Sequence, residues 1–411
     1  MSREMVDSGI PWIGDVPKEW KKIRIKHIFE IIGGNGFKDK YQGKESGDYP
    51  FYKTSDINGD CDYVSTSSNY VDADVVDIEN YNIVPVSSIV VSKIGAAMRK
   101  NHRKITTCDC CIDNNLQALH PIRTIDDVKY LYYLLKVVNF EWFDNNGTIP
   151  SVNNAKLKDL YVPWVSLSEQ QRIAEFLDRK CAEVDDMIAL QEQIIEELKA
   201  YKQSVITEAV TKGLNPAAPM RDSGIDWIGS IPEHWETAYL KRFCKVNSGR
   251  EIEIELEQDI DNAVPVYGSG GVFKYTNKPQ FNGEVVMFGR KGTLGKPIYA
   301  NGRFWAVDTM YYLTFGNSLE ARYCFYQLVA FNWEPYITQT ALPSIVATDI
   351  VNTSFAFPSI AEQQAIADYL DEKCADIDSL IQTKQSKIDS LKEYKKSIIY
   401  EYVTGKREVN E

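Results

Sequence analysis

Two segments of the chain combine cations and glycines without any acidic residue. They read IVVSKIGAAMRKNHRK at residues 89–104, with five Lys or Arg residues, and GRKGTLGKPIYANGR at residues 289–303, with four. Backbone N–H groups of glycine-containing turns and nearby cations bind the phosphate oxygens of nucleic acids. Arg is also the commonest reader of guanine edges, while Asn and Gln read adenine edges. The two segments therefore predict a nucleic-acid interface.

Four polar loops carry side chains that would complete such an interface: KTSDING (53–59), NNGTIPSVNN (145–154), GSGG (268–271) and TQTALPS (338–344). Any single cation of this kind is more often a solvated surface charge, but the paired position of the two clusters favours DNA contact for the group. The candidate DNA-binding residues are Lys53, Thr54, Ser55, Lys93, Arg99, Lys100, Arg103, Lys104, Ser269, Arg290, Lys291, Thr293, Lys296 and Arg303.

Familiar catalytic patterns are missing from the sequence. In GRKGTLGKP the glycine spacing and the Pro after Lys296 do not fit a phosphate-binding loop, and GSGG lacks the third glycine of a dinucleotide fingerprint. No adenine-methyltransferase motif of the Asp/Asn-Pro-Pro-Tyr type and no Pro-Asp…Asp/Glu-x-Lys nuclease pattern stands out, and four histidines limit His-based catalysis. The cluster CDCC (108–111), near His102 and His120, lacks zinc-type spacing and a second copy, so we interpret it as structural thiols.

Composition restricts the class of protein but does not identify its binding partner. The net charge of −12 does not exclude DNA, because the acid-free stretches matter more than the total charge. The N-terminus lacks the apolar core of a signal peptide, and no apolar run approaches the ~18–20 residues that cross a bilayer. Eight cysteines without an export signal indicate reduced thiols. We expect a cytoplasmic protein without a membrane partner.

The sequence contains an internal repeat. DSGIPWIGDVPKEW (7–20) returns as DSGIDWIGSIPEHW (222–235), and EQQRIAEFLDRKCAEVD (169–185) returns as EQQAIADYLDEKCADID (362–378). We call the first pair the doubled motif, and we interpret it as a turn with an aromatic anchor that begins each domain. The blocks between these repeats agree at scaffold-like positions and differ elsewhere, and the first block is longer between Ile57 and Ile89. Internal repeats on this scale predict two equivalent domains.

Each block is followed by a long helical pattern. Ser168 with Gln171, and Ser359 with Glu362, fit capping boxes. Heptads then predict a coiled coil of two rods, each ~65 Å long at 1.5 Å per residue, although plain amphipathic bundle helices are the alternative. Polar breaks recur at matching places, Gln191 with Lys384 and Lys202 with Lys395, and the sequence alone allows either direction. The predicted interface residues are Leu177, Cys181, Val184, Ile188, Ile195, Leu198, Leu370, Cys374, Ile377, Ile381, Ile388 and Leu391.

The expected domain order follows from these patterns. Residues 1–165 form a first variable block, 166–213 a long helix, 214–358 a linker and second variable block, and 359–406 a second long helix. Gly-terminated, β-branched runs predict strands in both blocks, and the segments 126–140 and 319–333 have the apolar density of buried helices. The fold class is therefore α/β (α+β), with two globular domains and two long helices.

The whole chain resembles the specificity (S) subunit of type I restriction–modification enzymes. The resemblance is carried by the doubled DSGI-x-WIG-x-x-P-x-x-W, the doubled EQQ-x-I-A-x-(F/Y)-LD-x-KCA, GRKGTLGK, and the (I/L)PS before each long helix. The first block departs from the pattern, because KIGAAMRK stands where the second has GRKGTLGK, and its contacts are expected to differ.

The resemblance implies a non-catalytic, DNA-binding subunit with two target-recognition domains. Its two helices form an antiparallel coiled coil with pseudo-two-fold symmetry that sets the distance between the domains, and each domain reads one half of a split, asymmetric target in double-stranded DNA. Two methyltransferase (M) subunits then carry S-adenosylmethionine and modify an adenine in each half. Motor-nuclease (R) subunits use ATP and Mg²⁺, so no cofactor is expected on this chain. The alternatives are a self-sufficient DNA-modifying enzyme and a coiled-coil DNA-binding adaptor.

Overall fold

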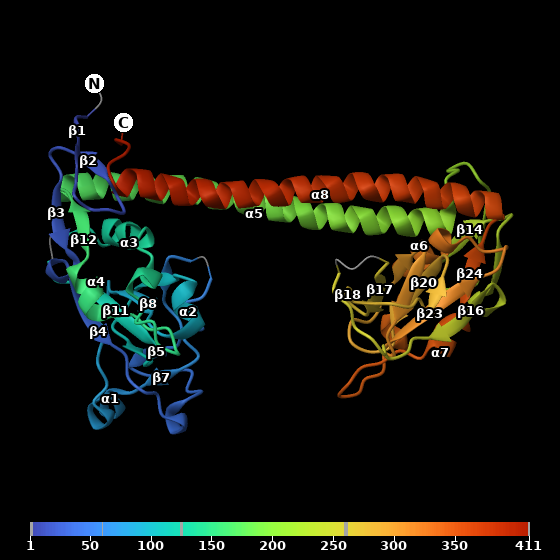
Figure 1. Ribbon diagram of the computed structural model, residues 1–411, viewed down its shortest axis with the longest axis horizontal. Coiled ribbons are helices and arrows are strands. Elements are labelled where there is room, and N and C mark those ends of the chain that lie inside the picture. Colours follow the sequence, from blue (N-terminus) through green and yellow to red (C-terminus); the bar gives the residue numbers. More distant parts are fainter. Residues whose placement is uncertain (1–2, 60, 124–125, 259–261, 410–411) are drawn as a thin grey trace. The chain divides into compact units, whose positions relative to one another are not determined.

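The computed structural model describes residues 3–59, 61–123, 126–258 and 262–409, and it divides into two compact units. Unit 1 comprises residues 1–189 and 388–411, and unit 2 comprises residues 190–387. Each unit combines one globular domain with a stretch of each of two long helices (Figure 1). Within the described part of the chain, no helix is both long and apolar enough to span a membrane.

The domain of unit 1 is built around a five-stranded sheet. The strands of the whole domain are β1 (Met5–Asp7), β2 (Asp15–Pro17), β3 (Lys21–Arg24), β4 (Phe29–Gly33), β5 (Tyr49–Tyr52), β6 (Tyr63–Val64), β7 (Tyr70–Val71), β8 (Ile89–Ser92), β9 (Arg103–Thr106), β10 (Cys111–Ile112), β11 (Leu116–Pro121) and β12 (Tyr161–Trp164). The main sheet has the order β4-β11-β8-β9-β6, beside smaller sheets β10-β5-β7, β1-β2 and β12-β3. All four residues of β8 are buried, as expected for a β-branched strand covered on both faces.

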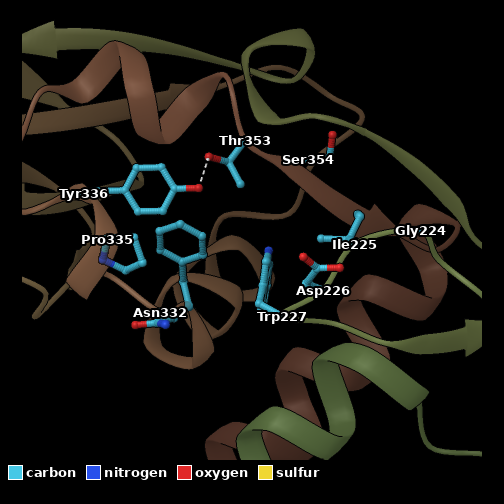
Figure 2. Close-up of a pocket in the computed structure, with 10 residues that line it drawn as sticks. Gly224, Ile225, Asp226, Trp227, Asn332, Pro335, Tyr336, Thr353 and Ser354 are labelled. Carbon is cyan, nitrogen blue, oxygen red and sulfur yellow. Dashed lines mark hydrogen bonds between the residues drawn. The ribbon is translucent and has the colours of Figure 1, made fainter.

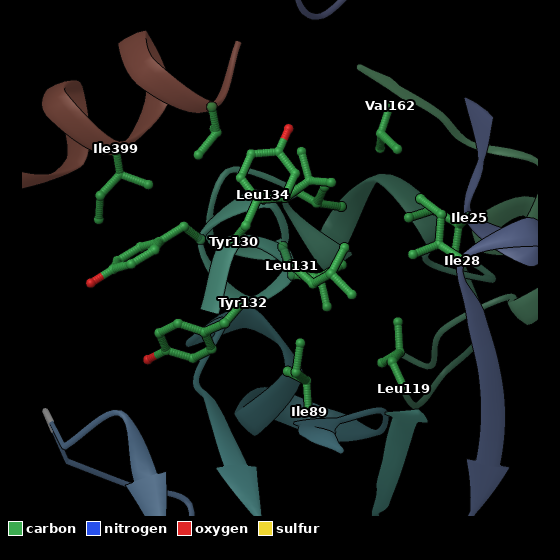
Figure 3. Close-up of a cluster of buried hydrophobic side chains, with 14 of the residues drawn as sticks. Ile25, Ile28, Ile89, Leu119, Tyr130, Leu131, Tyr132, Leu134, Val162 and Ile399 are labelled. Carbon is green, nitrogen blue, oxygen red and sulfur yellow. The ribbon is translucent and has the colours of Figure 1, made fainter. Parts of the chain in front are cut away.

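Helices cover this sheet and complete its core. They are α1 (Ala73–Glu79), α2 (Gly95–Arg99), α3 (Val128–Lys136) and α4 (Asn154–Asp159). The predicted buried helix at 126–140 is α3, which begins where the Asp127 side chain accepts a hydrogen bond from the Tyr130 N–H at 2.8 Å. Figure 3 shows its Leu131 and Leu134 among buried side chains of the sheet and Ile399 of the second long helix. The longer stretch between Ile57 and Ile89 supplies α1 and the fifth strand, β6.

The domain of unit 2 repeats this plan with four strands in the main sheet. Its strands are β13 (Met220–Asp222), β14 (Ser230–Pro232), β15 (Glu236–Tyr239), β16 (Cys244–Ser248), β17 (Val264–Gly268), β18 (Gly271–Thr276), β19 (Phe281–Asn282), β20 (Val285–Gly289), β21 (Ile298–Ala300), β22 (Arg303–Ala306), β23 (Met310–Phe315) and β24 (Ser354–Phe357). The order β16-β23-β20-β21 matches β4-β11-β8-β9, and β17 pairs parallel with β22 as β5 does with β10. Its helices are α6 (Ala321–Ala330) and α7 (Ala347–Val351).

Two long helices, α5 (Leu167–Lys212) and α8 (Ile360–Val403), run antiparallel to each other within each unit. In unit 1, the Phe176 ring lies 4.3 Å from that of Tyr402, and Lys395 pairs with Asp185 at 2.6 Å. In unit 2, Lys202 of α5 pairs with Asp378 of α8 at 2.7 Å. Residue numbers therefore rise along α5 while those of the facing residues of α8 become lower, as in an antiparallel pair.

The predicted heptad positions lie on the inner side of these helices. Two of the polar breaks, Lys202 and Lys395, carry their ammonium groups out to carboxylates of the facing helix, so these polar positions keep their charges solvated and paired. Eight of the predicted interface residues are buried: Leu177, Cys181, Val184, Ile195, Leu370, Cys374, Ile377 and Ile388. Four are half-buried: Ile188, Leu198, Ile381 and Leu391.

The starts of the helices correct one prediction. Helix α8 begins after Ser359, whose Oγ accepts a hydrogen bond from the Glu362 N–H at 3.3 Å, as predicted for its N-cap, while the Glu362 carboxylate accepts from Trp235. Helix α5 begins at Leu167, so its N-cap is Ser166 rather than Ser168, and the Glu169 N–H donates to Ser166 Oγ at 3.4 Å. Two serines in SLSEQ fit a cap, and only the backbone shows which one precedes the first turn.

Each copy of the doubled motif forms a hairpin that packs against the end of a long helix. In unit 1, residues 5–17 form β1 and β2, and Trp20 lies close to Gly405, just beyond α8. In unit 2, the Trp235 Nε1–H donates to Glu362 Oε1 at 3.0 Å, and its ring lies beside Gly213, just beyond α5. Both glycines have positive φ, which lets the chain leave the helix without a clash with the indole. The motif thus has the anchoring position that the sequence predicts.

Candidate nucleic-acid interface

Three polar segments meet on the domain of unit 2, and we call them the second polar face: residues 268–271, 290–297 and 338–344. The Thr293 N–H donates to Ser269 Oγ at 3.0 Å, which joins the β17–β18 turn to the basic turn after β20. The Ile345 N–H donates to the Arg290 carbonyl at 3.0 Å, and Lys291 forms a β-bridge with Ser344. The structure therefore brings together one of the basic segments and two of the polar loops that the sequence predicts separately.

Cations on this face are free to meet an anion. Arg290, Lys291 and Lys296 are exposed, and among the described residues none of them pairs with a carboxylate. The turn has firm support, because Gly295 lies against the buried Trp333, whose ring packs 5.3 Å from Phe288 of β20. A basic turn held rigid before binding loses little conformational entropy when it meets a phosphate.

Arg303 is exposed but belongs to another part of unit 2. It lies in β22, paired with Asn282 of β19, in the smaller sheet. The structure gives no contact between Arg303 and the second polar face, although the sequence grouped it with the basic turn.

Unit 1 has a counterpart, the first polar face, formed by residues 93–100 and 144–153. The Gly95 N–H donates to the Pro150 carbonyl at 2.8 Å, and the Val152 N–H donates to the Lys93 carbonyl at 2.9 Å. A β-bridge joins Ile94 to Ser151, as one joins Lys291 to Ser344 in unit 2. Here the segment KIGAAMRK folds into the short helix α2 instead of an open turn, so the two basic segments present different backbone conformations.

The predicted residues of the first polar face differ in accessibility. Lys93 is half-buried, whereas Arg99 and Lys100 are exposed, and Arg99 Nε lies 3.5 Å from Glu141 Oε1. An exposed ion pair at that distance is weak, and phosphate can replace the carboxylate. Arg99 and Lys100 are therefore the cations of this face that are accessible to DNA.

Arg103 and Lys104 contradict the prediction that they bind DNA. They lie in β9, with only 5% and 6% of their surface exposed. The Arg103 guanidinium donates to the Val138 carbonyl at 3.0 Å and lies over the Phe140 ring, and burial lowers its pKa to about 9. A guanidinium held by the protein's own carbonyl is a core group. The sequence shows the charge of Arg103 but not that β9 places this side chain in the interior of the domain.

Lys53, Thr54 and Ser55 lie in a turn directly after β5. The Lys53 N–H donates to Asp56 Oδ2 at 2.7 Å, and its ammonium donates to Gln42 Oε1 at 2.7 Å. Thr54 is half-buried and Ser55 is exposed. These side chains form a polar turn of their own.

A second turn, which sequence reasoning missed, links this polar turn to the first polar face. The Asp113 N–H donates to the Tyr52 carbonyl at 3.0 Å, and the Lys93 N–H donates to the Asn115 carbonyl at 2.8 Å. Residues 113–115 thus stand between the two predicted segments. The signal in the sequence is the polar run DNN between the apolar strands β10 and β11.

Equivalent polar contacts join each globular domain to a long helix. In unit 1, the Tyr133 hydroxyl of α3 donates to Asp178 of α5 at 2.6 Å, and burial together with this bond raises the pKa of Tyr133. In unit 2, the Tyr326 hydroxyl of α6 donates to Asp371 of α8 at 2.7 Å, and Arg322 pairs with the same carboxylate at 2.6 Å. Equivalent residues thus hold each polar face at a fixed orientation to its helix.

The cysteine-rich segment is part of the interior. Cys110 and Cys111 are buried, and burial raises the pKa of the Cys111 thiol to about 12. All eight cysteines have free thiols. In the described part of the chain, no group of three or more His, Cys, Asp or Glu residues is placed to hold a metal.

An open pocket of about 480 Å³ in unit 2 distinguishes the two copies (Figure 2). It lies between Trp227 of the doubled motif and the segment after α6 that includes Pro335. In unit 1 the residue in the place of Pro335 is Trp142, whose ring lies 5.4 Å from Trp12, the counterpart of Trp227. Because the small ring of Pro335 does not reach as far as an indole, the space that Trp142 occupies in unit 1 is left open in unit 2. The copies share a scaffold but differ in surface.

Comparison with known proteins identifies the scaffold. The family model of the type I restriction modification DNA specificity domain matches residues 17–200 and 232–393. The chain is 25% identical over 420 residues to the putative type I restriction enzyme MjaX specificity subunit of Methanocaldococcus jannaschii, covering 96% of this chain and 95% of that protein. It is 22% identical over 382 residues to the EcoprrI specificity subunit of Escherichia coli, covering 87% and 88%.

Solved structures share the fold. A chain from work on complex assembly and conformational transition of the type I R-M system has a TM-score of 0.72 at 15% identity, with 95% of this chain and 99% of that chain covered. The HsdS subunit from Thermoanaerobacter tengcongensis has a TM-score of 0.51 at 16% identity, with 95% and 98% covered. Because the family model covers both domains and much of both long helices, this chain belongs to the family of DNA specificity subunits of type I restriction–modification systems, which are non-catalytic components.

Proposed function

We propose that unit 1 reads one half of a bipartite, asymmetric target in double-stranded DNA and that unit 2 reads the other half. The observation that carries this proposal is the pairing of one repeated scaffold with two different polar faces. Each face joins a basic segment to a polar loop through equivalent bridges, Ile94 to Ser151 and Lys291 to Ser344. Equivalent scaffolds with different loop side chains present different hydrogen-bonding groups to base edges, which is how different sequences are read.

The chain needs partners to act on the target. We propose two methyltransferase subunits, one for each copy of the repeat, and motor-nuclease subunits that join them in the cytoplasm. S-adenosylmethionine, ATP and Mg²⁺ belong to those partners and not to this chain. The repeat supports this stoichiometry, because two equivalent surfaces suit two copies of one protein.

Exchange of one domain tests the proposal directly. Residues 221–358 are replaced by the corresponding segment of a relative, and the chimera is assembled with the methyltransferase subunits. Methylated adenines are then mapped in genomic DNA. We expect one half of the target to change and the other half to stay the same, because the polar face of unit 1 is untouched. A change in both halves would contradict the model of two independent readers.

The two alternatives have separate tests. The purified chain alone is incubated with S-adenosylmethionine and a mixed DNA pool, and methyl incorporation without a partner would indicate a self-sufficient enzyme. An adaptor would form the complex through its helices but would add no sequence selectivity to DNA binding. The specificity role predicts no methylation by the chain alone and selective binding in the complex.

A further inference from the structure

Two exposed aliphatic side chains occupy the same place in both copies of the repeat. Ile149 lies in the loop of the first polar face with 65% of its surface exposed, and Leu342 lies in the loop of the second with 61% exposed. A single exposed apolar residue needs no explanation. Here the loops read NNGTIPSV and TQTALPSI, so their first four residues differ while an exposed aliphatic residue, Pro and Ser recur.

The loops hold these side chains in place before any ligand binds. In unit 2, the Ser344 N–H donates to Thr338 Oγ1 at 3.0 Å, and Thr340 Oγ1 donates to the Leu342 carbonyl at 2.9 Å. In unit 1, the Ser151 N–H donates to Asp144 Oδ1 at 3.2 Å. Each aliphatic residue directly precedes a proline, which restricts its backbone to extended conformations. A rigid loop that presents an apolar tip to solvent indicates that the tip has an apolar partner.

The surroundings of the tips point to DNA as that partner. Each loop is bridged to a segment with exposed cations, Arg99 and Lys100 in unit 1 and Arg290 and Lys291 in unit 2. Phosphates drawn to those cations bring the base stack close to the loop tip. Proteins that insert Leu or Ile between base steps unstack them and kink the duplex, at a cost of about a few kcal/mol per step.

We propose that Ile149 and Leu342 are apolar wedges, each inserted into the base stack of the half-target that its unit reads. The wedge opens the stack beside the adenine that is to be methylated, and so lowers the cost of extruding that base into the active site of the partner. This rests on the proposed function, because it assumes two half-targets and adenine methylation. It assigns stack opening to the aliphatic tip that both loops share and leaves base reading to the residues that differ between them.

The test uses the complex assembled with its methyltransferase subunits and its mapped target. One duplex carries 2-aminopurine, which fluoresces when unstacked, at the target adenine of the half read by unit 2, and a second duplex carries it in the other half. For Leu342→Ala we expect the fluorescence rise on the first duplex to fall about 10-fold or more, because the unstacking cost is no longer offset. The methylation rate of the same half, measured on a duplex that keeps its adenine because 2-aminopurine has no 6-amino group to methylate, should fall by a similar factor. Ile149→Ala is the reciprocal control and should affect only the other half.

A rescue experiment separates a wedge from a merely structural residue. Replacing the thymine opposite the target adenine by an abasic site removes the pairing that holds the base, so it should restore Leu342→Ala to within about 3-fold of the wild-type rate. Leu342→Met, which keeps an apolar side chain of similar size, should retain most of the rate. Equal losses in both halves, or no rescue, would show that Leu342 serves assembly or folding and would overturn the wedge. Wild-type complex without selective binding would instead overturn the proposed function.

Discussion

At the scale of single residues, accessibility decides which of the predicted cations can contact DNA. Arg290 and Lys291 are exposed on a turn that Trp333 supports, whereas Arg103 is buried and bonded to a backbone carbonyl. All three stand in acid-free basic stretches, so charge alone does not separate them. The sequence could predict the basic segments, but strand pairing and α2 decide which side chains face solvent.

Salt dependence of DNA binding distinguishes the two kinds of cation. Replacing both Arg290 and Lys291 by Gln should lower the slope of log affinity against log salt by about 2, because each phosphate contact contributes about 0.9. The measurement is fluorescence anisotropy of target DNA with the assembled complex across a salt series. Arg103→Met is the control, and its slope should equal that of wild type. An unchanged slope in the double variant would remove these two residues from the interface.

Asp62 is a residue whose contribution to stability depends on pH. It accepts a hydrogen bond from Tyr132 at 2.6 Å and pairs with Lys136 at 3.0 Å and Lys129 at 3.4 Å. Burial alone would raise the pKa of Asp62, but the charge of Lys136 and the bond from Tyr132 outweigh it, so the pKa lies below its usual value. The stabilisation is therefore complete above the unfolded-state pKa of about 3.9 and is lost as the pH falls through the lower folded-state pKa.

Asp62→Asn should therefore destabilise unit 1 at neutral pH and much less in acid. We expect a loss of about 1–3 kcal/mol at pH 7, because two ammonium groups lose their charged partner. Calorimetry at pH 7 and at successively lower pH measures the difference between the variant and wild type. A difference that stays constant into acid would mean that the carboxylate charge is not the cause.

At the scale of elements, the long helices were the most predictable part of the chain and the loops the least. A heptad pattern depends on burial along one helix face, which the sequence displays directly. The turn 113–115 and the fold of KIGAAMRK into α2 depend on contacts with segments distant in sequence. The N-cap of α5 also escaped prediction, since Ser166 and Ser168 have the same chemistry.

Gln191 is a polar break inside α5 with a cost in stability. It is buried, and its Oε1 has no hydrogen-bond partner among the described residues. Gln191→Leu should raise stability by about 1 kcal/mol, because it removes an unpaired buried acceptor and adds apolar contact. Differential scanning calorimetry measures the shift in unfolding temperature. Gln193→Leu, on the exposed side of the same helix, is the control and should leave the temperature unchanged.

At the scale of the whole molecule, the repeat was predictable from the sequence because both copies keep the same anchors. The doubled motif, the helix starts and the paired strands follow from apolar and glycine positions that the two copies share. The surfaces could not be predicted in this way, because positions that differ between the two copies offer no internal comparison. The pocket beside Trp227, open because Pro335 replaces the Trp142 of unit 1, is an example.

The length of the helices sets the spacing of the half-targets if the coiled coil acts as a ruler. Removing residues 193–199 of α5 together with the facing residues 381–387 of α8 takes one heptad from each helix. At 1.5 Å per residue, the preferred gap should shorten by about three base pairs. Methylation of targets with graded gaps measures the preference. A deletion from α5 alone is the control, which should impair folding, and an unchanged gap in the double deletion would contradict the ruler.

The core of unit 1 has a consequence for how the protein is made. Ile398, Ile399 and Val403, close to the C-terminus, are buried among side chains of the first domain. A ribosome releases the first domain long before it adds these residues, and domains otherwise tend to fold in the order of synthesis. The half that is translated first is therefore completed last. Until then, the apolar side chains that Ile398, Ile399 and Val403 cover remain exposed to solvent.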